Sequence, residues 1–148
     1  MKRSEAHEQS AVFAWADMQS KVPGWEWLNA AFHVPNGGSR NKIEATNLKR
    51  QGVKSGVPDI AIAAARSGYN SLFIEMKHGN NRVTANQKVW IDRLRALGNA
   101  VAVCYSAEEA INVIRSYGKG ELGPYRKEMA GYGKNEGRRG NGTPQQNY

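Results

Sequence analysis

Val57-Pro58-Asp59-Ile60 opens the stretch of sequence that decides the fold, and Phe73-Ile74-Glu75-Met76-Lys77 closes it. Each run is apolar and is interrupted by charge, and side chains alternate between the two faces of a β-strand. In the second run Glu75 and Lys77 therefore share the face opposite the apolar one. In the first run Asp59 lies opposite Ile60. The segment 65–70 has the composition of a hairpin turn, so pairing would bring Asp59 close to Glu75 on a shared face.

Two carboxylates and a lysine beside a hydrophobic core are costly to desolvate unless they are paired or bound to a metal. They are also the groups that metal-assisted phosphodiester hydrolysis needs. Asp59 and Glu75 would hold a hard cation, Mg²⁺ or Mn²⁺, and the backbone carbonyl of Met76 could add another oxygen ligand. Such a cation polarises the phosphate and lowers the pKa of a bound water, and Lys77 would orient that water or stabilise transition-state charge. The alternative is a structural salt bridge between Lys77 and a carboxylate.

The composition indicates one domain with a polyanionic partner. The chain has 148 residues, enough for a real core, and a formal net charge of +8 at pH 7. This charge favours nucleic acid as the partner, although a basic soluble protein without one has the same composition. The single cysteine, Cys104, lies in an apolar run and is expected in the core of a cytoplasmic protein. No apolar run approaches the roughly 20 residues of a membrane span, so no membrane partner is expected.

The rest of the pattern alternates helices with strands. Helices are predicted over 4–21, 43–51, 84–97 and 106–117, and further strands over 25–34 and 99–105. Thr84 and Ser106 each open a helix with a capping box. The strand–helix–strand connection from Lys77 to residue 101 predicts a parallel pair. The core face of the helix 84–97 is predicted to consist of Val89, Trp90, Leu94 and Leu97.

Residues 118–148 differ in character from the rest of the chain. They are rich in glycine and basic residues, and their apolar residues are sparse and without period. We predict a folded domain over 1–117, followed by a tail that is mostly disordered or loosely docked.

The predicted first helix carries Glu8 at the end of an apolar stripe that includes Val12 and Trp15. Glu8 could therefore point inward. The alternative, which the sequence alone favours, is a solvated glutamate in the first helical turn.

A basic segment leads into Asp59. Between His33 and Pro58 the chain holds five basic residues and one acid, after a loop at 35–40 with little steric bulk. This segment is suited to phosphate contacts, and a solvated basic helix is the alternative. His33 could be a ligand, although a single histidine at a strand end is more often structural. The residues predicted to contact DNA are Asn36, Arg40, Lys42, Lys49, Lys54 and Arg82.

Taken together, these motifs resemble the VRR-NUC family of the PD-(D/E)XK nuclease superfamily. The resemblance runs from about residue 8 to 117. It rests on Glu8, the segments 35–38 and 52–56, Gly56-Val57-Pro58-Asp59, Glu75-Met76-Lys77, Gln87 before Trp90 and Leu94, and Gly98 before 101–103.

The resemblance implies an α/β fold of the restriction-endonuclease type, a mixed central sheet flanked by helices. It implies Asp59 and Glu75 as metal ligands, Lys77 as the catalytic lysine and Glu8 as a further carboxylate at the site. It also gives Gln87 a place in the active site. We treat this role as incompatible with the capping box, because one side chain would have to serve both.

The resemblance also sets the expected function, a Mg²⁺- or Mn²⁺-dependent, structure-selective DNA endonuclease. The compact chain looks like stand-alone bacteriophage members of the family, which are associated with homodimers acting on branched DNA such as Holliday junctions. Two alternatives remain open: a basic DNA-binding module of the same fold that does not cut, and an RNA-processing nuclease.

Overall fold

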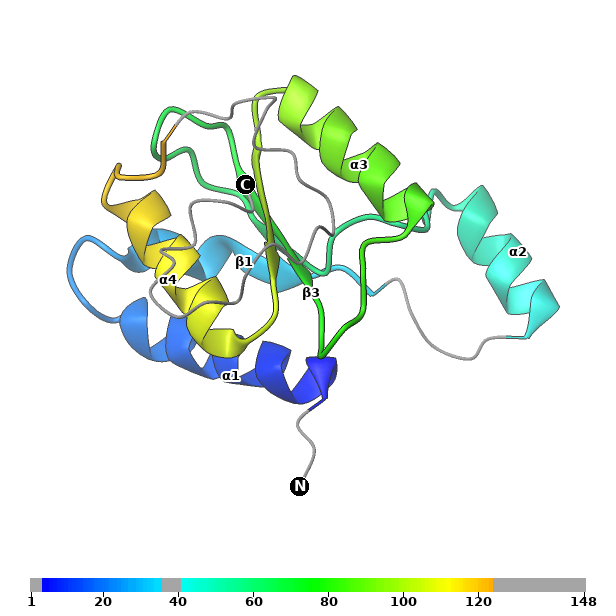
Figure 1. The fold of residues 1–148 in the computed structure, drawn as a ribbon, viewed down its shortest axis with the longest axis horizontal. Helices are drawn as coiled ribbons and strands as arrows, with labels where there is room; N and C mark the ends of the chain where they lie inside the picture. Colours follow the sequence, from blue (N-terminus) through cyan, green and yellow to red (C-terminus); the bar gives the residue numbers. More distant parts are fainter. Residues whose placement is uncertain (1–3, 36–40, 124–148) are drawn as a thin grey trace.

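The computed structural model describes residues 4–35 and 41–123, so the tail beyond 123 and the residues Asn36 and Arg40 lie outside the described part. The described chain runs through nine elements (Figure 1). They are α1 (Glu5–Gln19), the 3₁₀ helix η1 (Glu26–Ala30), β1 (Ala31–His33), α2 (Lys42–Arg50), β2 (Ile60–Ile62), β3 (Leu72–Met76), α3 (Ala85–Ala96), β4 (Ala100–Cys104) and α4 (Ala107–Gly118).

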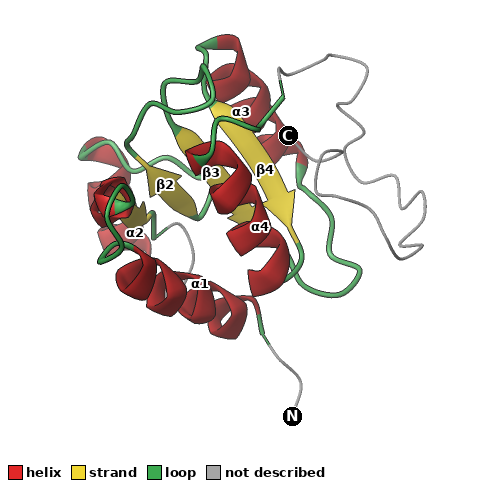
Figure 2. Ribbon diagram, turned by 90° about the vertical axis from the view of Figure 1, so that its left-hand side faces the viewer, coloured by secondary structure: helices red, strands yellow, loops and turns green. Residues whose placement is uncertain are grey.

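The four strands form one mixed sheet in the order β1-β2-β3-β4. The first three strands are antiparallel, and β3 and β4 are parallel neighbours joined through α3. Helices α1 and α4 pack on one face of the sheet over the larger core, and α3 packs on the other over a smaller one (Figure 2). The predicted α/β fold is confirmed. No helix of the described residues is long and apolar enough to cross a membrane.

The predicted hairpin between β2 and β3 is also confirmed. Ile60 pairs with Ile74 and Ile62 with Leu72. At its turn Tyr69 N–H donates to Arg66 C=O over 2.9 Å. The two residues between them have φ values of 54° and 79°, the left-handed pair of a type I′ turn. This turn matches the twist of the strands, but its Arg66–Tyr69 bridge is one residue out of step with the Ile62–Leu72 pair. The register that places residue 59 opposite residue 75 is therefore that of β2 and β3 themselves.

The strand predicted over 25–34 is wrong for most of its length. Residues 26–30 form η1, and only Ala31–His33 is extended. The helical turn buries Leu28 and stacks Trp25 and Trp27, whose ring centroids lie 5.6 Å apart. Trp27 also meets Tyr117 edge-on at 5.9 Å. Packing of the aromatic rings in the core therefore overrides their preference for strands.

The core face predicted for the helix 84–97 is partly wrong. Val89 and Leu97 are 51% and 65% exposed, whereas Ile91 and Leu94 are buried. The buried stripe runs through residues 91, 94 and 95, and half-buried Gln87 continues it at the spacing of one helical face. The difference between the predicted and the observed face of α3 matters for the site, because the observed face turns Gln87 towards the sheet.

The last helix begins as predicted at Ser106, whose hydroxyl accepts from Glu109 N–H over 3.1 Å. Its capping box is not formed as predicted, because the Glu109 carboxylate accepts from Tyr105 N–H instead of Ser106 N–H. Packing also continues past residue 117, since Leu122 is buried in the larger core. Cys104 is buried, as predicted.

Candidate active site

Asp59 and Glu75 meet at one end of the sheet, where β2 begins and β3 ends. Extending the register of β2 and β3 by one pair places the two residues opposite each other. Asp59 Oδ2 accepts from Met76 N–H over 2.8 Å, which ties the aspartate to the neighbouring strand. The hairpin thus brings together two carboxylates that lie on either side of its connecting turn in the sequence.

The carboxylate of Glu75 sits in an environment that opposes its charge. The side chain is 3% exposed, and among the described residues no hydrogen-bond donor reaches its Oε2. Burial, followed by the charge of Asp59, raises the pKa of Glu75 to about 8, against the pull of Lys77. Burial also raises the pKa of Asp59, although the hydrogen bond from Met76 N–H opposes the shift. A shared proton or a bound cation would relieve this pair.

Lys77 is the third member of the site. It is 7% exposed, and its Nζ lies 3.5 Å from Glu75 Oε1. Its backbone N–H donates to Cys104 C=O over 2.8 Å, which continues the parallel ladder beyond β3. The salt bridge expected as an alternative to catalysis is therefore present, and the same contact holds the ammonium group beside the carboxylates.

Gln87 serves both roles that we had treated as incompatible. Its Oε1 accepts from Thr84 N–H over 2.9 Å and completes the capping box of α3. Its Nε2 donates to Glu75 Oε1 over 2.9 Å. A side-chain amide carries an acceptor and a donor at its two ends, so the cap orients the amide that reaches the carboxylate.

Glu8 is buried, so the solvated alternative is wrong. Its Oε2 accepts from Ala107 N–H over 2.7 Å at the start of α4. This bond uses the carboxylate as a cap on a helix N-terminus and ties α1 to α4. Its predicted role as a metal ligand stays a prediction.

Two further residues approach Asp59: Glu5, which the sequence did not single out as part of the site, and His33, which it offered as a candidate ligand. Glu5 lies close enough for its charge to raise the pKa of Asp59. It shares a helical face with Glu8 three residues on, which is the signal that could have found it. His33 Nδ1 lies 2.8 Å from the carbonyl oxygen of Asp59 and 2.9 Å from Gln9 Nε2. Because that carbonyl only accepts, the contact requires the tautomer in which Nδ1 carries the proton.

The donor set at this end of the sheet suits a hard cation. Asp59 and Glu75 supply carboxylate oxygens, and Glu75 Oε2 lacks a donor. The carbonyl of Met76 points to the same side of β3 as its N–H, towards Asp59, because both groups of one strand residue face the same neighbour. Among the described residues, no group of three or more His, Cys, Asp or Glu side chains could hold a metal ion. Asp59 and Glu75 are two carboxylates, and a site with so few protein ligands leaves positions for substrate and water, as Mg²⁺ sites do.

Comparisons with known proteins identify relatives of this chain. Residues 3–108 match the model of the VRR-NUC domain. The chain belongs to the VRR-NUC family. A solved structure described as a VRR_NUC domain protein superposes with a TM-score of 0.69 at 33% identity, covering 81% of this chain and 92% of the other. Fanconi-associated nuclease 1 from Danio rerio is 36% identical over 52 residues, which are 35% of this chain and 5% of that relative. The match thus spans a small part of the relative's length.

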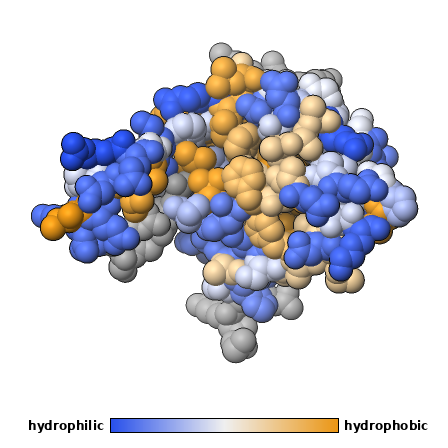
Figure 3. Space-filling model, turned by 180° about the vertical axis from the view of Figure 1, so that it is seen from behind, coloured by the Kyte–Doolittle hydropathy of each residue, from blue (hydrophilic) through white to orange (hydrophobic). Residues whose placement is uncertain are grey.

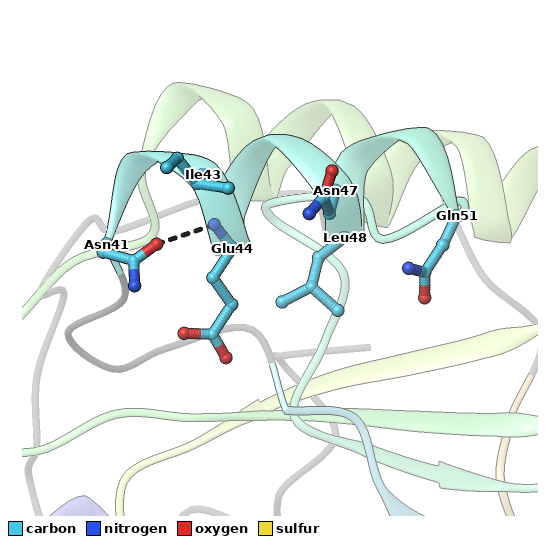
Figure 4. Close-up of a pocket in the computed structure, with 6 residues that line it drawn as sticks. All are labelled: Asn41, Ile43, Glu44, Asn47, Leu48 and Gln51. Atoms are coloured by element: carbon cyan, nitrogen blue, oxygen red, sulfur yellow. Dashed lines mark hydrogen bonds between the residues drawn. The ribbon is translucent and has the colours of Figure 1, made fainter.

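The basic residues that were predicted to contact DNA, and that the structure describes, lie on the surface of this VRR-NUC domain. Lys42, Lys49, Lys54 and Arg82 are exposed. Helix α2, capped by Asn41 and without a buried residue, projects from the sheet (Figure 1). One side of α2 is hollowed, and this open pocket contains none of the carboxylates described above (Figure 4). It is lined by Asn41, Ile43, Glu44, Asn47, Leu48 and Gln51.

Proposed function

We propose that the protein is a metal-dependent endonuclease that hydrolyses phosphodiester bonds in DNA. The observation that carries the proposal is the pair of half-buried Asp59 and buried Glu75, held beside Lys77, with a Glu75 oxygen that lacks a donor. A structural ion pair needs one carboxylate for one lysine, so the ion pair of Lys77 with Glu75 does not account for the second carboxylate beside it. Family membership supports the same activity.

Asp59, Glu75 and the carbonyl of Met76 would hold Mg²⁺ or Mn²⁺. When bound, the cation would polarise the phosphate and lower the pKa of a water molecule. Lys77, fixed by its contact with Glu75, would donate to the attacking water or to a phosphate oxygen. Gln87 holds Glu75 Oε1 and leaves Oε2 for the cation. Glu8 would add a ligand through Oε1 while its Oε2 keeps the bond from Ala107 N–H.

We further propose that the substrate is branched DNA, such as a four-way junction, and that the active form is a homodimer. A four-way junction has approximate two-fold symmetry and needs two opposed cuts, and a closed dimer supplies two sites related in the same way. A dimer would also bring +16, twice the +8 of one chain, to crowded phosphates. Trp25 and Trp27 offer little to such an interface, because they pack against the core of their own chain. We propose a cytoplasmic, phage- or prophage-encoded enzyme on the resemblance alone.

A single assay separates this proposal from its rivals. Labelled duplex, flap and four-way-junction DNA, and matching RNA, are incubated with the protein in Mg²⁺, Mn²⁺ or EDTA, and light scattering gives the mass in solution. We expect metal-dependent cuts that favour the junction, from a dimer. Binding without cuts would make the protein a non-catalytic module, and preferential cutting of RNA would make it an RNA-processing nuclease. A monomer with no preference for junctions would leave a general nuclease.

A further inference from the structure

The sheet face that carries Glu75 continues into an apolar row. Phe73 lies two residues before Glu75 on β3, so both side chains point to the same face. Phe73 pairs with Ala61, and Ala61 pairs with Phe32 on the edge strand β1. Residues directly opposite each other share a face, so the row Phe32–Ala61–Phe73 runs beside the carboxylates. At about 3.4 Å per residue, Phe73 and Ala61 lie roughly 7 Å along their strands from Glu75 and Asp59, and Phe32 lies one strand spacing of about 4.8 Å beyond Ala61.

The β1 end of this row is open. Phe73 packs beneath α3 in the smaller core, and Ala61 is 4% exposed. Phe32 is 51% exposed, and it is the only aromatic among the large, strongly exposed apolar residues of the described chain. Figure 3 shows apolar atoms gathered in the middle of the face seen from behind, with the hydrophilic atoms of α2 to one side. An aromatic ring is therefore exposed about 8 Å from Asp59, within one or two nucleotides of the proposed cutting site.

Size and charge select the occupant of this surface. A stable protein interface buries about 800 Å² on each partner, and one half-exposed ring supplies only a small part of that. A nucleobase has a flat apolar face that matches a single aromatic ring, and its backbone phosphates suit a chain of net charge +8. We infer that Phe32 is a stacking platform for an unpaired nucleobase next to the scissile phosphate. The inference rests on the proposed nuclease function and names the part of the substrate that the site recognises.

This placement makes Phe32 a residue that sets specificity. In intact duplex the faces of the bases are stacked on one another and are closed to a side chain. At a branch point or in a single strand a base can leave the stack at a cost of a few kcal/mol. Stacking on Phe32 therefore favours DNA that is branched or unpaired beside the cut, and it adds nothing to the binding of continuous duplex.

Binding in EDTA tests the inference without cleavage. A four-way junction and a matched duplex carry 2-aminopurine at the branch position, and its fluorescence reports stacking. We expect Phe32→Ala and Phe32→Leu to weaken junction binding by about tenfold, within the roughly 5- to 150-fold range for one stacked base, and to leave duplex binding unchanged. Phe32→Trp should retain junction binding and the quenching of fluorescence. Leu97→Ala, which removes a side chain that is 65% exposed at the far end of α3, is the matched control.

Junction affinity and fluorescence in Phe32→Ala and Phe32→Leu equal to those of the unmodified protein would overturn the inference. An equal loss on junction and duplex, or a change in the mass measured by sedimentation in place of a change in DNA affinity, would also overturn it. Failure of the nuclease proposal looks different, because the unmodified protein would then not cut any DNA in Mg²⁺. The two failures are therefore distinguishable in parallel reactions.

Discussion

At the scale of single residues, the account depends on the carboxyl group of Glu75. It is buried, faces Asp59, and receives a hydrogen bond from Gln87 on one oxygen and none on the other. Its pKa of about 8 makes it mostly protonated at neutral pH in the metal-free protein. A cation that displaces this proton gains the carboxylate as a ligand, so metal binding and proton release are coupled.

This pKa predicts how stability depends on pH in EDTA. The pKa of Glu75 is near 4.5 in the unfolded chain and about 8 in the folded one, so between these values the folded state binds more protons. The free energy of unfolding should therefore be highest at the acid end of this window. It should fall as pH rises towards 8, by at most about 1.4 kcal/mol per pH unit from this group.

Urea unfolding from pH 5 to 9 measures this dependence, and Glu75→Gln is the control, because it removes the titrating group and keeps its shape. The free energy of unfolding of the unmodified protein, relative to that of Glu75→Gln, should fall as pH rises. The apparent pKa belongs to the pair with Asp59, whose pKa is raised as well. If the difference in the free energy of unfolding stayed constant from pH 5 to 9, Glu75 would be ionised in the folded protein.

At the scale of elements, the N-terminus of α3 combines a cap with the active site. Gln87 joins Thr84 N–H to Glu75 Oε1, so the helix start fixes the orientation of a site residue. Which face of α3 is buried determines this arrangement. The sequence did not reveal that face, because apolar residues occur on more than one side of the helix.

The two functions of Gln87 can be separated by a pair of substitutions. Thr84→Ala removes the N-cap and should lower stability by about 1 kcal/mol. It should leave metal affinity nearly unchanged, because Gln87 still reaches Glu75. Gln87→Ala should lower stability and also alter metal affinity, because Glu75 Oε1 loses its donor. Calorimetric titration with Mn²⁺ measures the second effect, and equal metal affinities in the two variants would argue against a role of Gln87 in the site.

Local chemistry explains which elements the sequence could predict. The β2–β3 hairpin and the shared face of Asp59 and Glu75 follow from the alternation of side chains along the strands and from a turn-forming segment between them, all of which are close in sequence. The hydrogen bond from Ala107 N–H to Glu8 joins residues that are 99 positions apart, and no local sequence pattern predicts it. The segment of Trp25 and Trp27 has the composition of a strand, and only packing against α4 makes it helical.

At the scale of the whole molecule, the residues proposed to bind DNA lie apart from those proposed to cut it. The carboxylates lie at one end of the sheet, and the basic helix α2 projects away from its body (Figure 1). This division predicts that DNA affinity can be weakened while the metal site stays intact. The sequence indicated the basic segment but gave no sign that α2 stands without a buried residue.

Changing Lys42, Lys49 and Lys54 together to Ala tests this division. Each lost phosphate contact should flatten the slope of log K against log salt by about 0.9 on duplex DNA. Mn²⁺ affinity should be unaffected. The control changes Lys21 and Lys119, exposed residues just beyond the C-termini of α1 and α4, and should leave the slope unaltered. Equal slopes for the triple variant and the unmodified protein would place the DNA path elsewhere.

The central claim is that Asp59 and Glu75 hold a cation that cuts DNA, and one measurement tests it most directly. Cleavage of labelled four-way-junction DNA is followed at increasing Mg²⁺ for the unmodified protein, Glu75→Gln, and Tyr117→Phe, which loses hydrogen bonds to Ala64 and Arg66 away from the carboxylates. The account predicts cleavage that EDTA abolishes and a loss on the order of 10³-fold in Glu75→Gln, because metal catalysis supplies several kcal/mol. Tyr117→Phe should cut normally at temperatures where it is folded. Cleavage by folded Glu75→Gln at the unmodified rate would contradict the account.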